Sequence, residues 1–210
     1  VKFPADADGI VPLTDLPWFP DDAARRITEF LVAVWGEPTR DENLAWLAES
    51  LGQKADETPE ETIRRYLSAS FFKDHCQTYK KRPIYSLFSS GKHKAFEALV
   101  YLHRYNESTL ARLRAEYVVP LTGKMSERIR LLEDDATKAS STARKKIDKD
   151  IDKLRKKLEE LRQFDEKLRH LADMRISIDL DDGVKVNYGK FGTPTGDVLA
   201  DVKAITGGAS

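Results

Sequence analysis

Apolar residues in the N-terminal part of the chain recur at the spacing of helices, between residues that start and stop helices. Helices are expected over about 21–36, 39–51 and 58–79. The second and third begin with the pattern of a capping box, in which two side chains satisfy free backbone N–H groups: Thr39 with Glu42, and Thr58 with Glu61. The residues before them, 1–19, are expected to be irregular or to form a short strand.

The pattern changes in the segment that follows. Pro83 ends the third helix, and residues 81–85 are expected to be extended because the residue before a proline avoids the helical region. A turn is expected at 89–91. A further helix is predicted over 94–105, with Phe96, Leu99, Val100 and His103 on one side.

The longest regular pattern covers residues 108–175. Apolar residues recur there at steps of three and four in a highly charged background, which is typical of a coiled coil. A polar break at 138–142 divides the pattern into two comparable arms, and this favours an antiparallel helical hairpin. Pro120 is expected to kink the first arm or to mark its start.

The period changes again after residue 175. Ile176, Ile178 and Leu180 alternate with polar residues, a turn signal follows at 181–183, and alternation resumes, which predicts a β-hairpin. The predicted fold class is therefore mainly α. It comprises a helical domain over 1–107 with a basic loop at 79–94, a coiled-coil hairpin over 108–175, and a β-hairpin with a short C-terminal tail over 176–210.

Charge is unevenly distributed along a chain that has 35 basic and 35 acidic residues. Residues 1–62 hold 5 basic and 14 acidic side chains, whereas residues 63–171 hold 26 basic and 15 acidic ones. An excess of positive charge in the middle of the chain suits an anionic partner, nucleic acid first among the candidates. It equally suits internal pairing with the acidic N-terminal part, and both interpretations stay open.

Candidate DNA contacts concentrate in residues 75–96, which contain five basic residues and no carboxylate. Cations of this kind bind phosphates by releasing counterions, and hydroxyls on a turn add neutral contacts. The candidate DNA-binding residues are Lys80, Lys81, Arg82, Ser89, Ser90, Lys92 and Lys94. The interleaved aromatic residues are assigned to the core instead, and the lysines of the hairpin to an ordinary solvated face.

Catalytic and metal-binding patterns are missing from the sequence. The four histidines lack ligand spacing, and the single cysteine, Cys76, excludes a disulfide framework or a cysteine-rich zinc site and suggests a reducing, cytoplasmic location. No apolar run is long enough for a membrane span, so a soluble protein is expected. The chain starts at Val1, and we expect it to be a piece of a larger protein.

Four segments, in order, resemble a known family. They are Asp8-Gly9-Ile10-Val11-Pro12 with Trp18-Phe19, the run from Tyr79 to Lys92, the run from Ala98 to Asn106, and the run from Ile178 to Tyr188. Together they are similar to the C-terminal region of BREX-type adenine-specific DNA methyltransferases, a phage-defence family. The family usually has tryptophan where this chain has Ser86, so the resemblance implies that an aromatic contact is missing there.

This resemblance implies a parent enzyme that transfers a methyl group from S-adenosylmethionine to the N6 of adenine, with the base flipped out of the duplex. The catalytic and cofactor motifs belong to an N-terminal domain and do not occur here, so no catalytic, cofactor or metal residue is assigned. The implied partners are double-stranded DNA, other domains of the methyltransferase and other phage-defence proteins. The expected function is DNA engagement and domain spacing, and the alternative is a coiled-coil scaffold that does not bind DNA.

Overall fold

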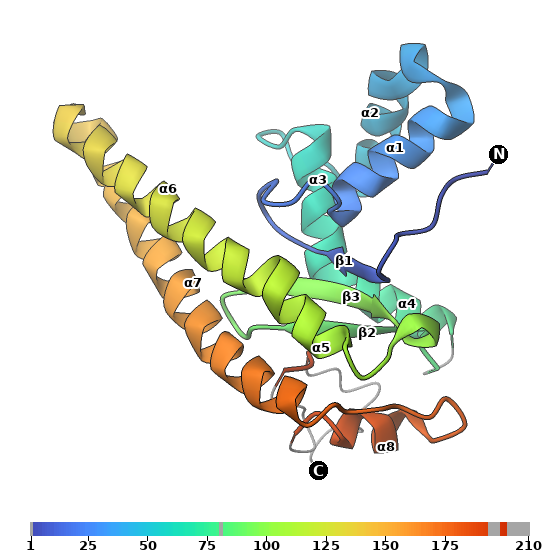
Figure 1. Cartoon of the computed structure of the whole chain (residues 1–210). Coiled ribbons are helices and arrows are strands. Elements are labelled where there is room, and N and C mark those ends of the chain that lie inside the picture. The colour runs from blue at the N-terminus through green and yellow to red at the C-terminus, as the bar shows by residue number, and fades with distance from the viewer. Residues whose placement is uncertain (1, 80–81, 193–197, 201–210) are drawn as a thin grey trace.

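A three-stranded antiparallel sheet lies between a long helical hairpin and a group of N-terminal helices (Figure 1). The computed structural model describes residues 2–79, 82–192 and 198–200. The strands β1 (Ile10–Pro12), β2 (Tyr85–Ser89) and β3 (Glu97–Tyr101) have the order β1-β3-β2. In the register of β3, Leu99 pairs with Val11 on one side and with Leu87 on the other.

Strand β3 corrects the prediction of a helix over 94–105. Every residue from Ala95 to Val100 is buried, because β3 is the central strand and both faces of the sheet are covered. Such a strand has a continuous apolar run, and a short run of this kind cannot be told from a buried helix by its period alone. Only a short 3-10 turn, Leu102–Arg104, follows the strand.

The N-terminal helices confirm the predicted pattern. They are α1 (Ala23–Trp35), α2 (Arg40–Ser50), α3 (Pro59–Tyr66) and α4 (Phe72–Thr78), the last two joined by a π-helical turn, Leu67–Phe71. Thr58 and Glu61 form the predicted capping box. Thr39 is the N-cap of α2, but the predicted capping box with Glu42 is wrong. The Thr39 hydroxyl donates to the Trp35 and Gly36 carbonyls and does not cap the helix.

The two predicted helical arms are present and lie against each other, and their packing as a coiled coil stays a prediction. Its first arm comprises α5 (Thr109–Arg112), a π-helical turn (Leu113–Val118) and α6 (Val119–Lys138), and its second arm is α7 (Ser141–Asp173). The arms lie side by side and run in opposite directions (Figure 1), and the predicted polar break is the connection between them. Pro120 lies at the start of α6, directly after the π-helical turn, where a missing N–H costs least. Among the described residues, no helix is both long and apolar enough to cross a membrane.

The hairpin and the sheet share one hydrophobic core. Phe96, directly before β3, and Phe164 of α7 are both almost fully buried, and their ring centroids lie 6.2 Å apart. Tyr117 of the first arm packs against Phe19 and Phe96. These contacts hold the part of the hairpin around Tyr117 and Phe164 on the sheet. Side chains in this part of α7 therefore have defined positions relative to the strands.

The predicted β-hairpin at 176–191 is wrong. The structure has an irregular segment there, followed by the short helix α8 (Val184–Gly189). Val184 and Tyr188 are four residues apart, so their spacing fits one face of a helix as well as alternate positions of a strand. The outer edge of β2 pairs with residues 198–200 instead, where the Ser89 N–H donates to the Val198 carbonyl at 2.9 Å. The tail beyond residue 200 and residues 193–197 lie outside the described residues.

A buried ion pair joins α1 to α3. The Arg64 guanidinium donates to the Asp22 carboxylate at 2.9 Å, and both side chains are almost fully buried. Asp22 also accepts from the Arg25 N–H as the N-cap of α1, and Arg64 donates to the Thr14 carbonyl. The pair therefore connects the start of α1, the segment after β1 and α3.

Removal of the Arg64 side chain should leave the Asp22 carboxylate buried without its partner. The expected loss for Arg64→Met is about 3–5 kcal/mol in the free energy of unfolding, measured with urea. The matched control is Arg65→Met, which removes a more exposed guanidinium paired with Glu57 and should cost much less. Equal losses for the two variants would contradict a structural role for the buried pair.

Candidate nucleic-acid interface

The candidate DNA-binding residues lie at the two ends of β2. Arg82 precedes the strand, Ser89 ends it, and Ser90, Lys92 and Lys94 belong to the loop 90–96 that leads into β3. Lys80 and Lys81 lie outside the described residues. The antiparallel pairing of β2 with β3 therefore separates Arg82 from the loop by the length of the strand.

The Glu160 carboxylate of α7 binds the loop 90–96. It accepts hydrogen bonds from the Ser90 hydroxyl at 2.7 Å, from the His93 N–H at 2.7 Å and from the Ala95 N–H at 3.2 Å. Gly91 has a φ of +135°, and a Cβ atom at this position would lie 3.1 Å from a Glu160 oxygen. Glycine thus allows the backbone to approach the carboxylate, and three charge-assisted hydrogen bonds hold the loop on α7.

Three of the candidate residues make hydrogen bonds within the protein. The Ser90 hydroxyl donates to Glu160 and accepts from the Phe96 N–H, and the Ser89 hydroxyl donates to Glu97 at 3.3 Å. The Lys94 ammonium lies 3.5 Å from the Glu97 carboxylate and donates to the Ser68 carbonyl. These bonds position the loop, so any phosphate contact by these three side chains would compete with them.

Arg82 and Lys92 differ from those three residues. Both are exposed, and neither side chain has an ion pair or hydrogen bond with any residue in the described ranges. Because Glu160 holds the loop, Lys92 lies beside the middle of α7. Lys156 and Lys167 occupy the same stripe of α7 as Glu160, four residues before it and seven after it.

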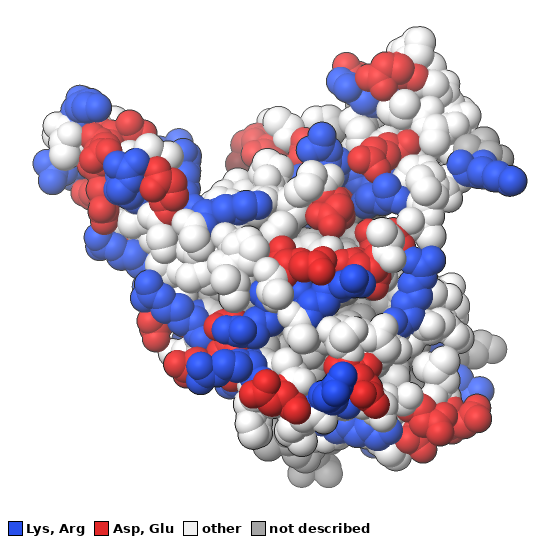
Figure 2. Space-filling model, viewed as in Figure 1, with Lys and Arg blue, Asp and Glu red and all other residues white. Residues whose placement is uncertain are grey.

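We call Lys92, Lys156 and Lys167 the basic row. Lys156 and Lys167 are also exposed and without ion partners in the described part of the chain. From the sequence, the hairpin lysines were expected on an ordinary solvated face, and nothing in it indicated that Glu160 joins the loop to the helix. A contact between residues 90 and 160 has no signature in the local pattern. Figure 2 shows Lys and Arg side chains over the hairpin, interspersed with Asp and Glu.

The acidic N-terminal part and the basic middle of the chain pair in several places. Lys157 binds Asp15 at 2.5 Å, Arg64 binds Asp22, and Arg65 binds Glu57 at 2.7 Å. Internal pairing thus accounts for part of the charge asymmetry. None of these pairs includes Arg82 or a lysine of the basic row. Internal pairing and binding of an anionic partner, the two interpretations of the charge asymmetry, therefore apply to different residues.

Histidine and cysteine chemistry is not evident at this surface. His75 is packed among aromatic rings and its Nε2 atom accepts from the Ile84 N–H at 3.1 Å, while burial lowers its pKa. Burial also raises the pKa of the Cys76 thiol, which disfavours the reactive thiolate. Within the described ranges, no group of three or more histidine, cysteine, aspartate or glutamate residues could hold a metal ion.

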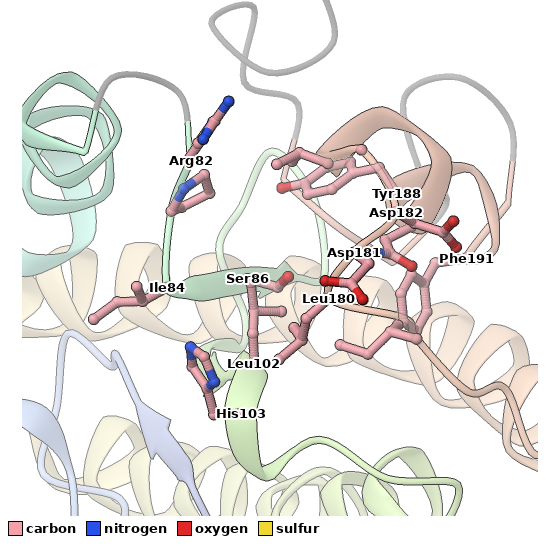
Figure 3. Close-up of a pocket in the computed structure, with 15 residues that line it drawn as sticks. Arg82, Ile84, Ser86, Leu102, His103, Leu180, Asp181, Asp182, Tyr188 and Phe191 are labelled. Atoms are coloured by element: carbon pink, nitrogen blue, oxygen red, sulfur yellow. The ribbon is translucent and has the colours of Figure 1, made fainter.

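A cavity lies near the other end of β2. It has a volume of about 470 Å³ and is lined by residues around Arg82 and Ser86, by the turn after β3 and by the segment 178–191 (Figure 3). Ser86 is the position at which the resemblance implies a missing aromatic contact. The cavity was not expected from the sequence, because the segment 178–191 was predicted to form a β-hairpin.

Comparison with known proteins shows that the chain is similar to part of two adenine-specific methyltransferases. It is 59% identical over 212 residues to the adenine-specific methyltransferase BrxX of Escherichia coli O9:H4 (strain HS), and 40% identical over 208 residues to PglX of Lacticaseibacillus casei (strain Zhang). The matches cover 99% and 97% of this chain. The chain spans 17% of the length of these curated relatives. No family model matches it.

The chain is therefore related to the C-terminal region of BREX-type adenine-specific methyltransferases. This confirms the resemblance that the four sequence segments indicated. The activity, substrate and partners of a whole methyltransferase are taken up below as proposals for this chain.

The buried Glu97 side chain predicts a measurable pH dependence. Desolvation raises the pKa of Glu97 above its usual range, although Lys94 and the Ser68 and Ser89 hydroxyls oppose this. A carboxyl group with a raised pKa stabilises the fold in acid, and this contribution is lost as the pH rises through the folded-state pKa. Glu97→Gln should therefore gain stability relative to the parent chain as the pH rises above about 4.3, the pKa of an unperturbed glutamate.

The measurement is the free energy of unfolding in urea, determined for the parent chain and for Glu97→Gln across a pH series. Glu166→Gln is the control, since Glu166 is exposed on α7, and its stability difference from the parent should not follow the same rise. A difference for Glu97→Gln that is flat or falls with pH would contradict a raised pKa.

Proposed function

We propose that this chain is a non-catalytic, DNA-engaging region of a site-specific adenine-N6 methyltransferase. The observation that carries the proposal is the docking of the loop 90–96 on α7 by Glu160, which places the loop that holds Lys92 on the helix that carries Lys156 and Lys167. Exposed cations without internal partners are free to neutralise phosphates and to release their counterions. The basic row is therefore proposed to follow one DNA backbone.

A second group of cations is proposed at the start of β2. Arg82 is exposed, and its neighbours Lys80 and Lys81 complete the basic run that the sequence analysis assigned to phosphate contact. Phosphate contact by Ser89, Ser90 and Lys94 stays a prediction, and it would require the release of their hydrogen bonds to Glu97, Glu160 and Ser68. The basic row and Arg82 are thus the stronger candidates.

The proposed role within a whole enzyme follows from the relatives. Methyl transfer from S-adenosylmethionine to double-stranded DNA would belong to other domains, and this chain would supply neither catalytic nor cofactor residues. Helix α7 has 33 residues and is about 50 Å long, so the hairpin is suited to hold other domains or phage-defence proteins at a distance. We propose that its seam packs as a coiled coil.

One observation favours a second candidate, a scaffold that does not bind DNA. The pairs Lys157–Asp15 and Arg64–Asp22 show that some of the positive charge is used within the chain. Under this alternative the hairpin recruits another protein, and a polar residue at Leu154 or Leu158 would abolish the recruitment. Leu158 is buried in the shared core, so such variants must first be shown to fold.

The test is fluorescence anisotropy of a labelled duplex titrated with the 210-residue chain across a salt series. If the basic row, Arg82, Lys80 and Lys81 each neutralise one phosphate, log K should fall against log salt with a slope of roughly −5. Replacing the three lysines of the basic row by glutamine should weaken binding and reduce the magnitude of the slope by roughly three units. The triple change Lys80→Gln, Lys81→Gln and Arg82→Gln should act in the same way.

The matched control changes three lysines at the far end of the hairpin: Lys138→Gln, Lys145→Gln and Lys146→Gln. This variant has the same net charge as the basic-row variant and should keep the parent slope. Equal losses for the two variants would show unspecific attraction and contradict the proposed surface. No duplex binding even at low salt would favour the scaffold.

A further inference from the structure

The cavity beside Ser86 has apolar walls from two directions. Pro83, Ile84 and Leu102 line it on the side of the sheet, and Leu180 and Phe191 line it on the side of α8. Its volume of about 470 Å³ lies within the range of small-molecule sites in proteins. Walls of this kind suit a flat, largely apolar ring system.

Three polar side chains of the cavity, those of Ser86, Arg82 and Asp181, have no side-chain partner among the described residues. Ser86 is only 7% exposed, and its hydroxyl has no hydrogen bond with any residue in the described part of the chain. The Arg82 guanidinium and the Asp181 carboxylate are also without ion partners among those residues, whereas the neighbouring Asp182 binds Lys190 at 3.1 Å. These three groups line the cavity and are therefore available to hydrogen-bond or to pair with a ligand that enters it.

These groups surround the cavity. In Figure 3, Arg82 stands at one side, Leu180 and Asp181 stand at the other, and the Ser86 hydroxyl points toward the latter. The ligand should therefore carry a negative charge at one end and a hydrogen-bond donor at the other. A carboxylate only accepts hydrogen bonds, so Asp181 would favour an exocyclic amino group, which offers two N–H bonds, over a ring with a single N–H.

We propose that this cavity binds one nucleotide whose base carries an exocyclic amino group. The base lies between the apolar walls, its amino group donates to Asp181, and its phosphate binds Arg82. The Ser86 hydroxyl donates to or accepts from the edge of the base. This proposal deepens the DNA-engaging function and rests on it, and it adds the recognition of a single unstacked base to contacts with the phosphate backbone.

The first experiment is saturation-transfer NMR with the 210-residue chain and four probes: dAMP, dCMP, dTMP and inorganic phosphate. Saturable binding of dAMP or dCMP is expected, with dTMP roughly tenfold weaker because it has no amino group for Asp181. Equal binding of dTMP would overturn the role of Asp181. Phosphate that displaces dAMP with equal affinity would reduce the site to an anion contact at Arg82 and overturn the proposal.

Two variants test the cavity itself. Ser86→Trp fills the space with an indole ring and should abolish dAMP binding, and its thermal unfolding shows whether the chain still folds. Asp181→Asn should bind dAMP more weakly and lose the preference over dTMP. Its matched control is Asp173→Asn, an exposed carboxylate at the end of α7 that should leave both affinities unchanged. An Asp181→Asn chain that keeps the full preference would contradict the proposal even if Ser86→Trp fails to fold.

A duplex arm distinguishes a free nucleotide from a base in DNA. A duplex with one extrahelical adenine should bind more tightly than the fully paired duplex, and Ser86→Trp should remove only this difference. Selective dAMP binding without the difference would assign the site to free nucleotides. If neither selective dAMP binding nor the preference for the extrahelical adenine were observed, the nucleotide site would be overturned. Loss of paired-duplex binding in the basic-row variant would still support the DNA-engaging function.

Discussion

The position of Lys92 in the basic row depends on one carboxylate, that of Glu160. Glu160 accepts three hydrogen bonds from the loop 90–96, and Gly91 allows the backbone to come close to it. The Phe96 and Phe164 rings pack beside this contact, so the loop and the helix are joined through both polar and apolar groups. Glu160 thus binds the Ser90 hydroxyl and also holds the loop that carries Lys92 on α7.

The division of charge explains how a chain with no net charge can present a basic surface. Cations that hold the fold together have defined acidic partners: Arg64 binds Asp22, and Lys94 binds Glu97. Arg82 and the lysines of the basic row have no acidic partner among the described residues. Net charge averages over both groups, and only the structure separates them.

The sequence predicted the elements that depend on local signals and missed those that depend on distant contacts. The capping box at Thr58 and the break before α7 were predicted correctly, because caps and polar breaks act within a few residues. Strand β3 was missed because its burial on both faces comes from remote elements, and α8 because Val184 and Tyr188 fit two periods. For the candidate site, the sequence indicated basic residues whose contact with DNA stays a prediction, and it contained no signal for Glu160 or the cavity, which depend on contacts that cross the fold.

Amide hydrogen exchange in the loop 90–96 tests the central role of Glu160 most directly. The His93 and Ala95 N–H groups donate to Glu160 and should exchange slowly in the parent chain. In Glu160→Ala they should exchange rapidly while the amides of β3 stay protected, and Glu166→Ala should change neither. Unchanged protection of His93 and Ala95 in Glu160→Ala would contradict the conclusion that α7 positions this loop.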